Sequence, residues 1–133
     1  MYREALQSDQ QRADNDPSNA GWQRDLSVSL NKIGDILSAQ GKLDEAKAVF
    51  EQSRSIRQTL SENDPSNAGW QADVVVSRAK LMFIALDQGD KKEAKKHIKA
   101  ALVVLEPLEK AGLLNASQQG WPEDMRRRLK ELE

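Results

Sequence analysis

NDPSNAGWQ, the stretch at residues 15–23, occurs again letter for letter at residues 63–71. The aspartates of the two copies, Asp16 and Asp64, set a period of 48 residues. A degraded third copy lies at Gly120-Trp121, offset by 51 residues from Gly69-Trp70. Fixed periods of about 20 to 50 residues are typical of proteins built from stacked repeats, in which each repeat needs its neighbours to cover its apolar face. The sequence therefore predicts a repeat protein.

The residues of one period show the apolar spacing of two helices. After the first copy of the block, apolar side chains recur every three or four residues, which places them on one side of a helix; they are Trp22, Leu26, Leu30, Ile33 and Leu37. We expect Asp16-Pro17 to begin this helix and Gly41 to end it. A second stripe follows at once and comprises Leu43, Ala46, Phe50, Ser53, Ile56 and Leu60. So short a connection makes the two helices antiparallel neighbours.

The second period repeats this scheme. Its first helix carries Trp70, Val74, Leu81 and Ala85, and its second carries Ala94, Ile98, Ala101, Leu105 and Leu108. Pro107 should kink or end the second helix, because proline lacks the amide hydrogen and crowds the preceding turn. Further on, a short terminal helix with a charged outer face is predicted by Trp121, Met125, Leu129 and Leu132.

These elements define a single all-α domain over residues 1–133. In the register of the repeat, residues 1–14 are the second helix of an upstream repeat whose first helix is missing, so we expect the chain to be cut from a longer protein. Residues 16–63 are the first complete repeat, residues 64–112 are the second, and residues 118–133 form a terminal capping helix.

The composition excludes several classes of function. The formal net charge is −1, so no global field attracts nucleic acid or an anionic membrane. The chain has 0 cysteines and 1 histidine, and it lacks phosphate-binding and dinucleotide-binding glycine motifs. We therefore predict no metal, no cofactor and no catalytic residue. No apolar run approaches the roughly 20 residues that span a bilayer, and no export leader precedes the repeats, so we expect a cytoplasmic protein.

At these positions the sequence resembles the tetratricopeptide repeat family, in a long-period bacterial form with DPSNAGWQ-like junctions. In the first complete repeat the resemblance rests on Ile33-Gly34, Leu37, Gly41, Ala46, Phe50 and Ser53. The second repeat has Leu81-Met82, Ala85, Gly89, Ala94, Ile98 and Ala101 at the equivalent positions. Met82 departs from the family pattern, because it replaces the small residue that lets two helices approach closely.

The resemblance implies an α-solenoid, in which antiparallel helix pairs stack in a right-handed superhelix closed by a C-terminal capping helix. Its concave surface would hold a peptide or a partner protein, and the chain would be a non-catalytic scaffold. The residues that map to this surface are Val28, Asn31, Lys32, Asp35, Ser38, Val76, Ala79, Lys80, Phe83 and Leu86. Some relatives grip a terminal carboxylate with lysine and asparagine, but here Asp35 occupies a clamp position and would repel the anion.

Two alternatives stay open at this point. One is a structural spacer or self-association segment of a larger protein, which forms a homodimer through the N-terminal helix, where Tyr2, Ala5 and Leu6 lack a covering partner. The other concerns Phe83, which either contacts a partner or packs on the terminal helix.

Several conspicuous residues have simpler interpretations. The lysines of residues 91–99 are expected to form a solvated helix face, because nucleic-acid binding needs aromatic platforms or a strongly basic domain. An anionic partner for these lysines is the alternative. His97 lies among them and is expected at the surface. We expect Trp22 and Trp70 to lie in the core between repeats rather than at a binding surface.

Overall fold

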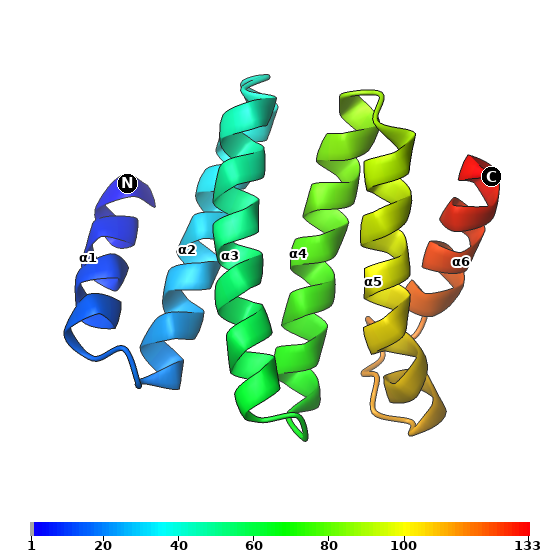
Figure 1. Cartoon of the computed structure of the whole chain (residues 1–133). Helices are drawn as coiled ribbons and strands as arrows, with labels where there is room; N and C mark the ends of the chain where they lie inside the picture. Colours follow the sequence, from blue (N-terminus) through cyan, green and yellow to red (C-terminus); the bar gives the residue numbers. More distant parts are fainter. Residues whose placement is uncertain (1) are drawn as a thin grey trace. The chain divides into compact units, whose positions relative to one another are not determined.

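The computed structural model describes residues 2–133, with side chains from residue 4 onward, and every regular element in that part of the chain is a helix (Figure 1). The helices are α1 (Tyr2–Asn15), α2 (Ala20–Ala39), α3 (Leu43–Asn63), α4 (Ala68–Asp87), α5 (Lys91–Lys110) and α6 (Trp121–Leu132). Met1, which was predicted to belong to the first helix, lies outside the described residues, as does the side chain of Tyr2.

Contacts divide the chain into two compact units, residues 1–63 and residues 64–133. In unit 1, α2 packs against both α1 and α3, and in unit 2, α5 packs against both α4 and α6. Successive helices within each unit are antiparallel (Figure 1). The predicted fold class is therefore confirmed as all-α, with neighbouring helices packed in succession as in an α-solenoid. The right-handed superhelix stays a prediction.

The repeated nonapeptide builds a turn followed by a helix cap. In the first copy, the Asp16 carbonyl accepts a hydrogen bond from the Asn19 amide at 3.0 Å. The Asp16 carboxylate accepts another from the Ser18 hydroxyl at 2.9 Å. Asn19 then caps α2, because its side-chain oxygen accepts from the backbone amide of the third residue after it at 3.1 Å. The side chain of Gln23 donates back to the Pro17 carbonyl at 3.5 Å, which ties the helix to the turn.

The predicted helix start at Asp16-Pro17 is wrong. The helix α2 begins at Ala20, because Asp16 uses its oxygens within the turn. Asn19 is as good a capping residue as aspartate, and it is the one whose side chain reaches the first free amides.

The second copy of the junction folds in the same way, and the third repeats the turn but not the side-chain cap of the helix. In the second copy, the Ser66 hydroxyl donates to the Asp64 carboxylate at 2.8 Å, and Asn67 caps α4. In the loop before α6, the Ser117 hydroxyl donates to the Asn115 side chain at 2.8 Å, as the equivalent serines do. The third copy therefore extends back to Asn115, although NASQQGW shares only three letters with DPSNAGW at matched positions.

The two helix pairs make their close contact with different residues. In unit 1, a β-carbon added at Gly34 would lie 2.5 Å from the ring of Phe50, so α2 and α3 approach closely because position 34 has no side chain. In unit 2 the equivalent residues are Met82 and Ile98, and both belong to one buried cluster. A longer side chain on α4 is thus matched by a smaller one on α5, which explains how the departure at Met82 is accommodated.

Unit 1 also buries a polar cluster on α2 and α3. The Ser53 hydroxyl donates to the Ser27 carbonyl, and Arg57 Nε donates to the Ser27 hydroxyl, both at 3.0 Å. None of the three residues is more than 5% exposed. The positions 48 residues further on belong to the apolar core of unit 2 and carry Val75, Ala101 and Leu105. The same helix pair therefore accepts either a polar or an apolar set at these three positions.

Two predictions about helix ends and packing need correction. Trp22 and Trp70 are half-buried rather than core residues, because each lies in the first turn of its helix, where fewer neighbours cover it. Pro107 does not end α5, which continues to Lys110, so the predicted end is wrong and the alternative, a kink, stays a prediction. Proline is tolerated there because it lies in the last turn, where the loss of one internal hydrogen bond leaves the rest of the helix intact.

Candidate partner-binding pocket between α4 and α6

One side of α4 carries small and apolar residues in a row. Val76, Ala79 and Phe83 follow one another at spacings of three and four residues, so they lie on the same side of the helix. The Phe83 side chain is 45% exposed, and Val76 and Ala79 are half-buried. A large aromatic residue left this open beside small neighbours leaves a hollow next to α4.

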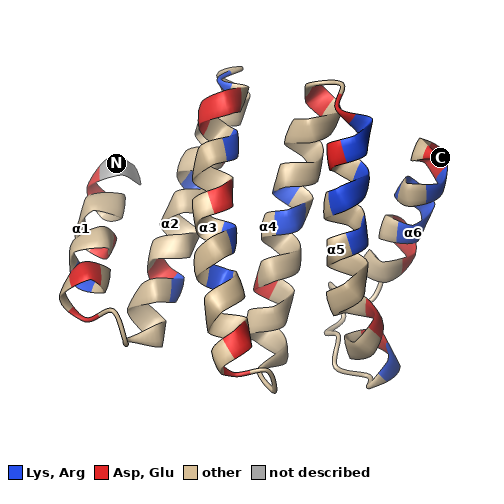
Figure 2. Ribbon diagram, viewed as in Figure 1, with Lys and Arg blue, Asp and Glu red and all other residues tan. Residues whose placement is uncertain are grey.

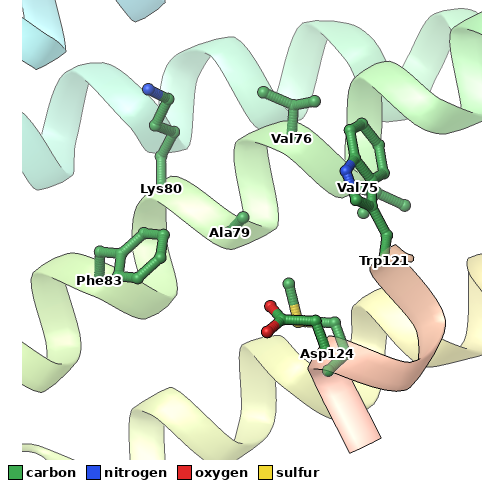
Figure 3. A pocket seen from close by; sticks show the side chains of 8 residues that line it. Val75, Val76, Ala79, Lys80, Phe83, Trp121 and Asp124 are labelled. Atoms are coloured by element: carbon green, nitrogen blue, oxygen red, sulfur yellow. The ribbon is translucent and has the colours of Figure 1, made fainter. Parts of the chain in front are cut away.

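A pocket of about 290 Å³ lies between this row and α6 (Figure 3). In Figure 3, Val76, Ala79 and Phe83 stand along α4, and Trp121 and Asp124 reach from α6. The lining residues are Val75, Val76, Ala79, Lys80, Phe83, Trp121, Asp124 and Met125. Pockets for whole small ligands measure about 300 to 1,000 Å³, so this one lies at the lower end of that range and has room for one bulky side chain.

The helix α6 is held firmly against the rest of unit 2. Met125 is 6% exposed and belongs to the core cluster of α4 and α5, against which Trp121 also packs. Arg126 Nη2 donates to Glu109 Oε1 at 2.7 Å, which joins α6 to α5. That hydrogen bond raises the pKa of Arg126 above its usual value. The α6 wall of the pocket is therefore a built part of the unit.

The carboxylate at the pocket is neutralised within α6. Asp124 accepts hydrogen bonds from Arg127 and from Arg128 Nε, the latter at 2.9 Å. The hydrogen bond from Arg128 holds the pKa of Asp124 below its usual value, because it stabilises the charged form. The Arg128 guanidinium also lies 5.0 Å from the centre of the Phe83 ring, a cation–π contact that fixes the ring. Asp124 thus has cationic partners of its own, and the pocket offers mainly apolar surface.

The residues predicted for partner binding divide between the two units. On α4, Val76, Ala79, Lys80 and Phe83 line the pocket, whereas Leu86 packs against the core of unit 2. The others lie on α2 in unit 1, where Lys32 and Asp35 are exposed, Val28 and Ser38 are half-buried, and Asn31 is buried. The structure therefore brings four of the ten predicted residues together in one pocket.

Sequence reasoning missed the opposite wall of this pocket. Trp121 and Met125 were recognised as the apolar stripe of a terminal helix, but Asp124 was not considered for the site, and Val75 was not singled out. Which face of α4 the terminal helix covers depends on the path of residues 111–120, and apolar spacing does not specify that path. Of the two alternatives for Phe83, the ring contacts Arg128 of the terminal helix, and it also stays 45% exposed, so contact with a partner stays a prediction.

His97 is buried at 1% exposure, so its predicted surface position is wrong. Arg78 Nη1 lies 3.1 Å from His97 Nδ1. Because a guanidinium can only donate, Nδ1 is the acceptor and the ring hydrogen belongs on Nε2. Nε2 in turn lies 3.2 Å from Glu93 Oε1. The histidine therefore links α4 to α5 through its Nδ1.

Comparison with protein families finds a match for part of the chain. Residues 26–66 match the family model described as a tetratricopeptide repeat. They comprise α2 from Leu26 onward, all of α3 and the start of the second junction. The 48-residue period relates this matched helix pair to α4 and α5. Searches of curated proteins and of solved structures give no match.

Among the described residues, none of the helices combines the length and the apolar character that crossing a membrane requires.

Proposed function

We propose that this chain is a non-catalytic protein-interaction module, and that the pocket between α4 and α6 receives a bulky apolar side chain from a partner protein or peptide. The observation that carries the proposal is the pocket itself, with an exposed Phe83 beside the small residue Ala79. Tetratricopeptide repeats generally mediate protein–protein interactions, and residues 26–66 match that family.

The chemistry of the pocket indicates how a partner is recognised. Aromatic anchors in well-formed pockets dominate the binding energy of protein interfaces. Here the Phe83 ring is held by Arg128, so a partner side chain meets a wall that is already in place. Asp124 is paired with two arginines, so the partner residue that enters the pocket needs no positive charge. Among the α2 residues predicted for partner binding, Lys32 and Asp35 are exposed and stay predictions that are separate from this pocket.

A selection from a displayed peptide library tests the proposal. Peptides selected on the native chain should share one large apolar residue. Phe83→Ala should weaken their binding about tenfold or more, and Ala79→Leu should do the same by filling the pocket. Val103→Ala is the matched control, because Val103 is an apolar residue on α5 that is 74% exposed and lies outside the pocket.

Far-UV circular dichroism of each variant checks that helicity is retained. The proposal is wrong if no peptides with an apolar anchor are selected, or if Phe83→Ala and Ala79→Leu bind them as well as the Val103→Ala control. Self-association, the alternative from the sequence, predicts dimers in sedimentation equilibrium at micromolar concentration that persist in the Phe83→Ala variant.

A further inference from the structure

The exposed side of α5 carries a cluster of lysines near its start. The cluster, here called the lysine face, comprises Lys91, Lys92, Lys95, Lys96 and Lys99. Lys95 is half-buried and the other four are exposed. The five residues span eight helical steps, which is about 12 Å along the helix axis. Figure 2 shows them as basic segments grouped along one half of α5, and none of them lines the pocket between α4 and α6.

The chain contains its own control for this face, because α3 is the equivalent helix of the first repeat. The positions 48 residues earlier carry Leu43, Asp44, Lys47, Ala48 and Glu51. Five lysines on α5 thus replace a set with one lysine and two acids. Since α3 forms the same kind of helix and packs on α2 as α5 packs on α4, the fold does not require these lysines.

The position of the lysines in the helix also opposes the usual electrostatics. Lys91 and Lys92 are the first two residues of α5, where the positive end of the helix dipole disfavours cations. The equivalent first turn of α3 carries Asp44 and Glu45, which the dipole favours. Residues that oppose a local preference of the helix without improving its packing are expected at functional sites.

Few acids of the unit neutralise this face. Glu93 lies 3.8 Å from Lys96 and also 3.2 Å from His97, and Asp90 caps the helix by accepting from the Glu93 amide at 3.0 Å. Within the described part of the chain no ion pair involves Lys91, Lys92, Lys95 or Lys99. A concentrated positive surface is therefore open to a negative partner.

The charge of the exposed side reverses further along the same helix. Glu106 and Glu109 are exposed near the end of α5, beyond the exposed Val103. A long polyanion such as a nucleic-acid duplex, or an extended surface such as an anionic membrane, would meet these carboxylates once it passed the lysines. A short acidic segment would not meet these carboxylates, because it can end within the roughly 12 Å of helix that the lysines occupy.

We propose that the lysine face of α5 docks a short acidic helix of a partner protein, with carboxylates three and four residues apart that match the lysines turn by turn. This surface is independent of the pocket between α4 and α6. Its positive charge is confined to about two helical turns, so it selects an acidic segment of similar length.

Binding of a designed peptide tests the proposal on the whole chain. The probe is a fluorescein-labelled alanine-based peptide of about 20 residues, with glutamates three and four residues apart in one half. The variant K92D/K96A/K99E introduces the residues that α3 carries at the equivalent positions, so it should fold. The control variant R12A/K42E/K110E changes the net charge by the same amount at exposed sites elsewhere.

We expect the native chain to bind the probe in low salt. The variant K92D/K96A/K99E should lose about tenfold or more in affinity, and the control variant should stay within about twofold. Equal losses in both variants would mean that diffuse charge is responsible and would overturn the proposal. So would tighter binding of a DNA duplex or of phosphatidylserine vesicles than of the peptide, or no binding of the peptide at all. If K92D/K96A/K99E loses helicity, Lys96→Ala alone must weaken peptide binding by a measurable factor, because a single exposed lysine is removed without a change in the helix start.

Discussion

Replacement of Gly34 by alanine tests the close contact between α2 and α3. The added β-carbon would lie 2.5, 2.7 and 2.8 Å from three atoms of the Phe50 ring. Carbon atoms in favourable contact are about 3.5 to 4.0 Å apart, so something must move. Phe50 is 2% exposed, and its ring cannot turn away without leaving a cavity. The backbone of one helix must therefore shift.

The size of the effect follows from two opposing contributions. Alanine is favoured over glycine in a helix interior by about 1 kcal/mol. Overpacking a tight core costs about 1 to 3 kcal/mol, and three ring atoms at these distances place Gly34→Ala at the upper end. We expect a net loss of about 2 kcal/mol in the free energy of unfolding.

Urea unfolding followed by circular dichroism measures this loss. Gly21→Ala is the control, because its β-carbon would lie 3.4 Å from Asn19 Oδ1, an ordinary contact; it should leave stability unchanged or raise it by up to about 1 kcal/mol. In a Phe50→Leu background the cost of Gly34→Ala should largely disappear, with a coupling free energy of about 2 kcal/mol. The reasoning is refuted if Gly34→Ala is as stable as Gly21→Ala, or if its cost is the same with leucine at position 50.

Three further predictions concern other features of the two units. The triple variant S27V/S53A/R57L gives the polar cluster of unit 1 the apolar residues that unit 2 has at the equivalent positions, and it should be neutral or stabilising by about 1 to 4 kcal/mol in urea unfolding. Ser27→Val alone removes an acceptor from Arg57 and should cost about 1 to 3 kcal/mol. Trp22→Ala should cost about 1 to 2 kcal/mol rather than the roughly 3 to 5 of a buried aromatic residue, and a loss within the higher range would show that the residue is core after all. The pKa of Asp124 is lower in the folded chain than its ordinary value of 3.8, so the charged carboxylate stabilises the fold at pH values above 3.8. This stabilisation is lost as the pH falls through the lowered pKa. Asp124→Asn should therefore lower the melting temperature at pH about 7 but change it less at pH about 3.

The repeat and the helix pairs could be predicted because they rest on short-range patterns. Nine identical residues make the same turn twice, and the hydrogen bonds that close the turn and cap the helix join residues within the nonapeptide. The predicted helix start was wrong because Asp16 and Asn19 are both good capping residues. Only the turn geometry shows that the Asp16 oxygens are already used.

The position of His97 was predictable, yet the neighbouring lysines concealed it. His97 lies three residues after Ala94 and four before Ala101, both of which were placed on the buried stripe. Composition suggested a solvated run, whereas helical spacing placed the ring inside. Spacing is the stronger guide here, because the direction of a side chain is set by the helix and not by its neighbours in sequence.

The pocket was only half predictable. The α4 wall follows from the spacing of Val76, Ala79 and Phe83, which is a local property of one helix. The α6 wall depends on how a loop without regular structure returns the terminal helix to unit 2, and on the pairing of Asp124 with Arg128. Such contacts join residues far apart in sequence, so no local pattern specifies them.

In each helix pair the two residues at the close contact have complementary sizes, and this limits which helices can be exchanged between the pairs. A chimera that joins α4 to α3 would set the thioether of Met82 against the ring of Phe50, two large groups where the native pairs have one large and one smaller partner. The reverse chimera, α2 with α5, would set Gly34 against Ile98 and leave a void. Exchange between relatives, or by design, should therefore succeed for whole hairpins cut at the DPSNAGWQ junctions and fail for single helices.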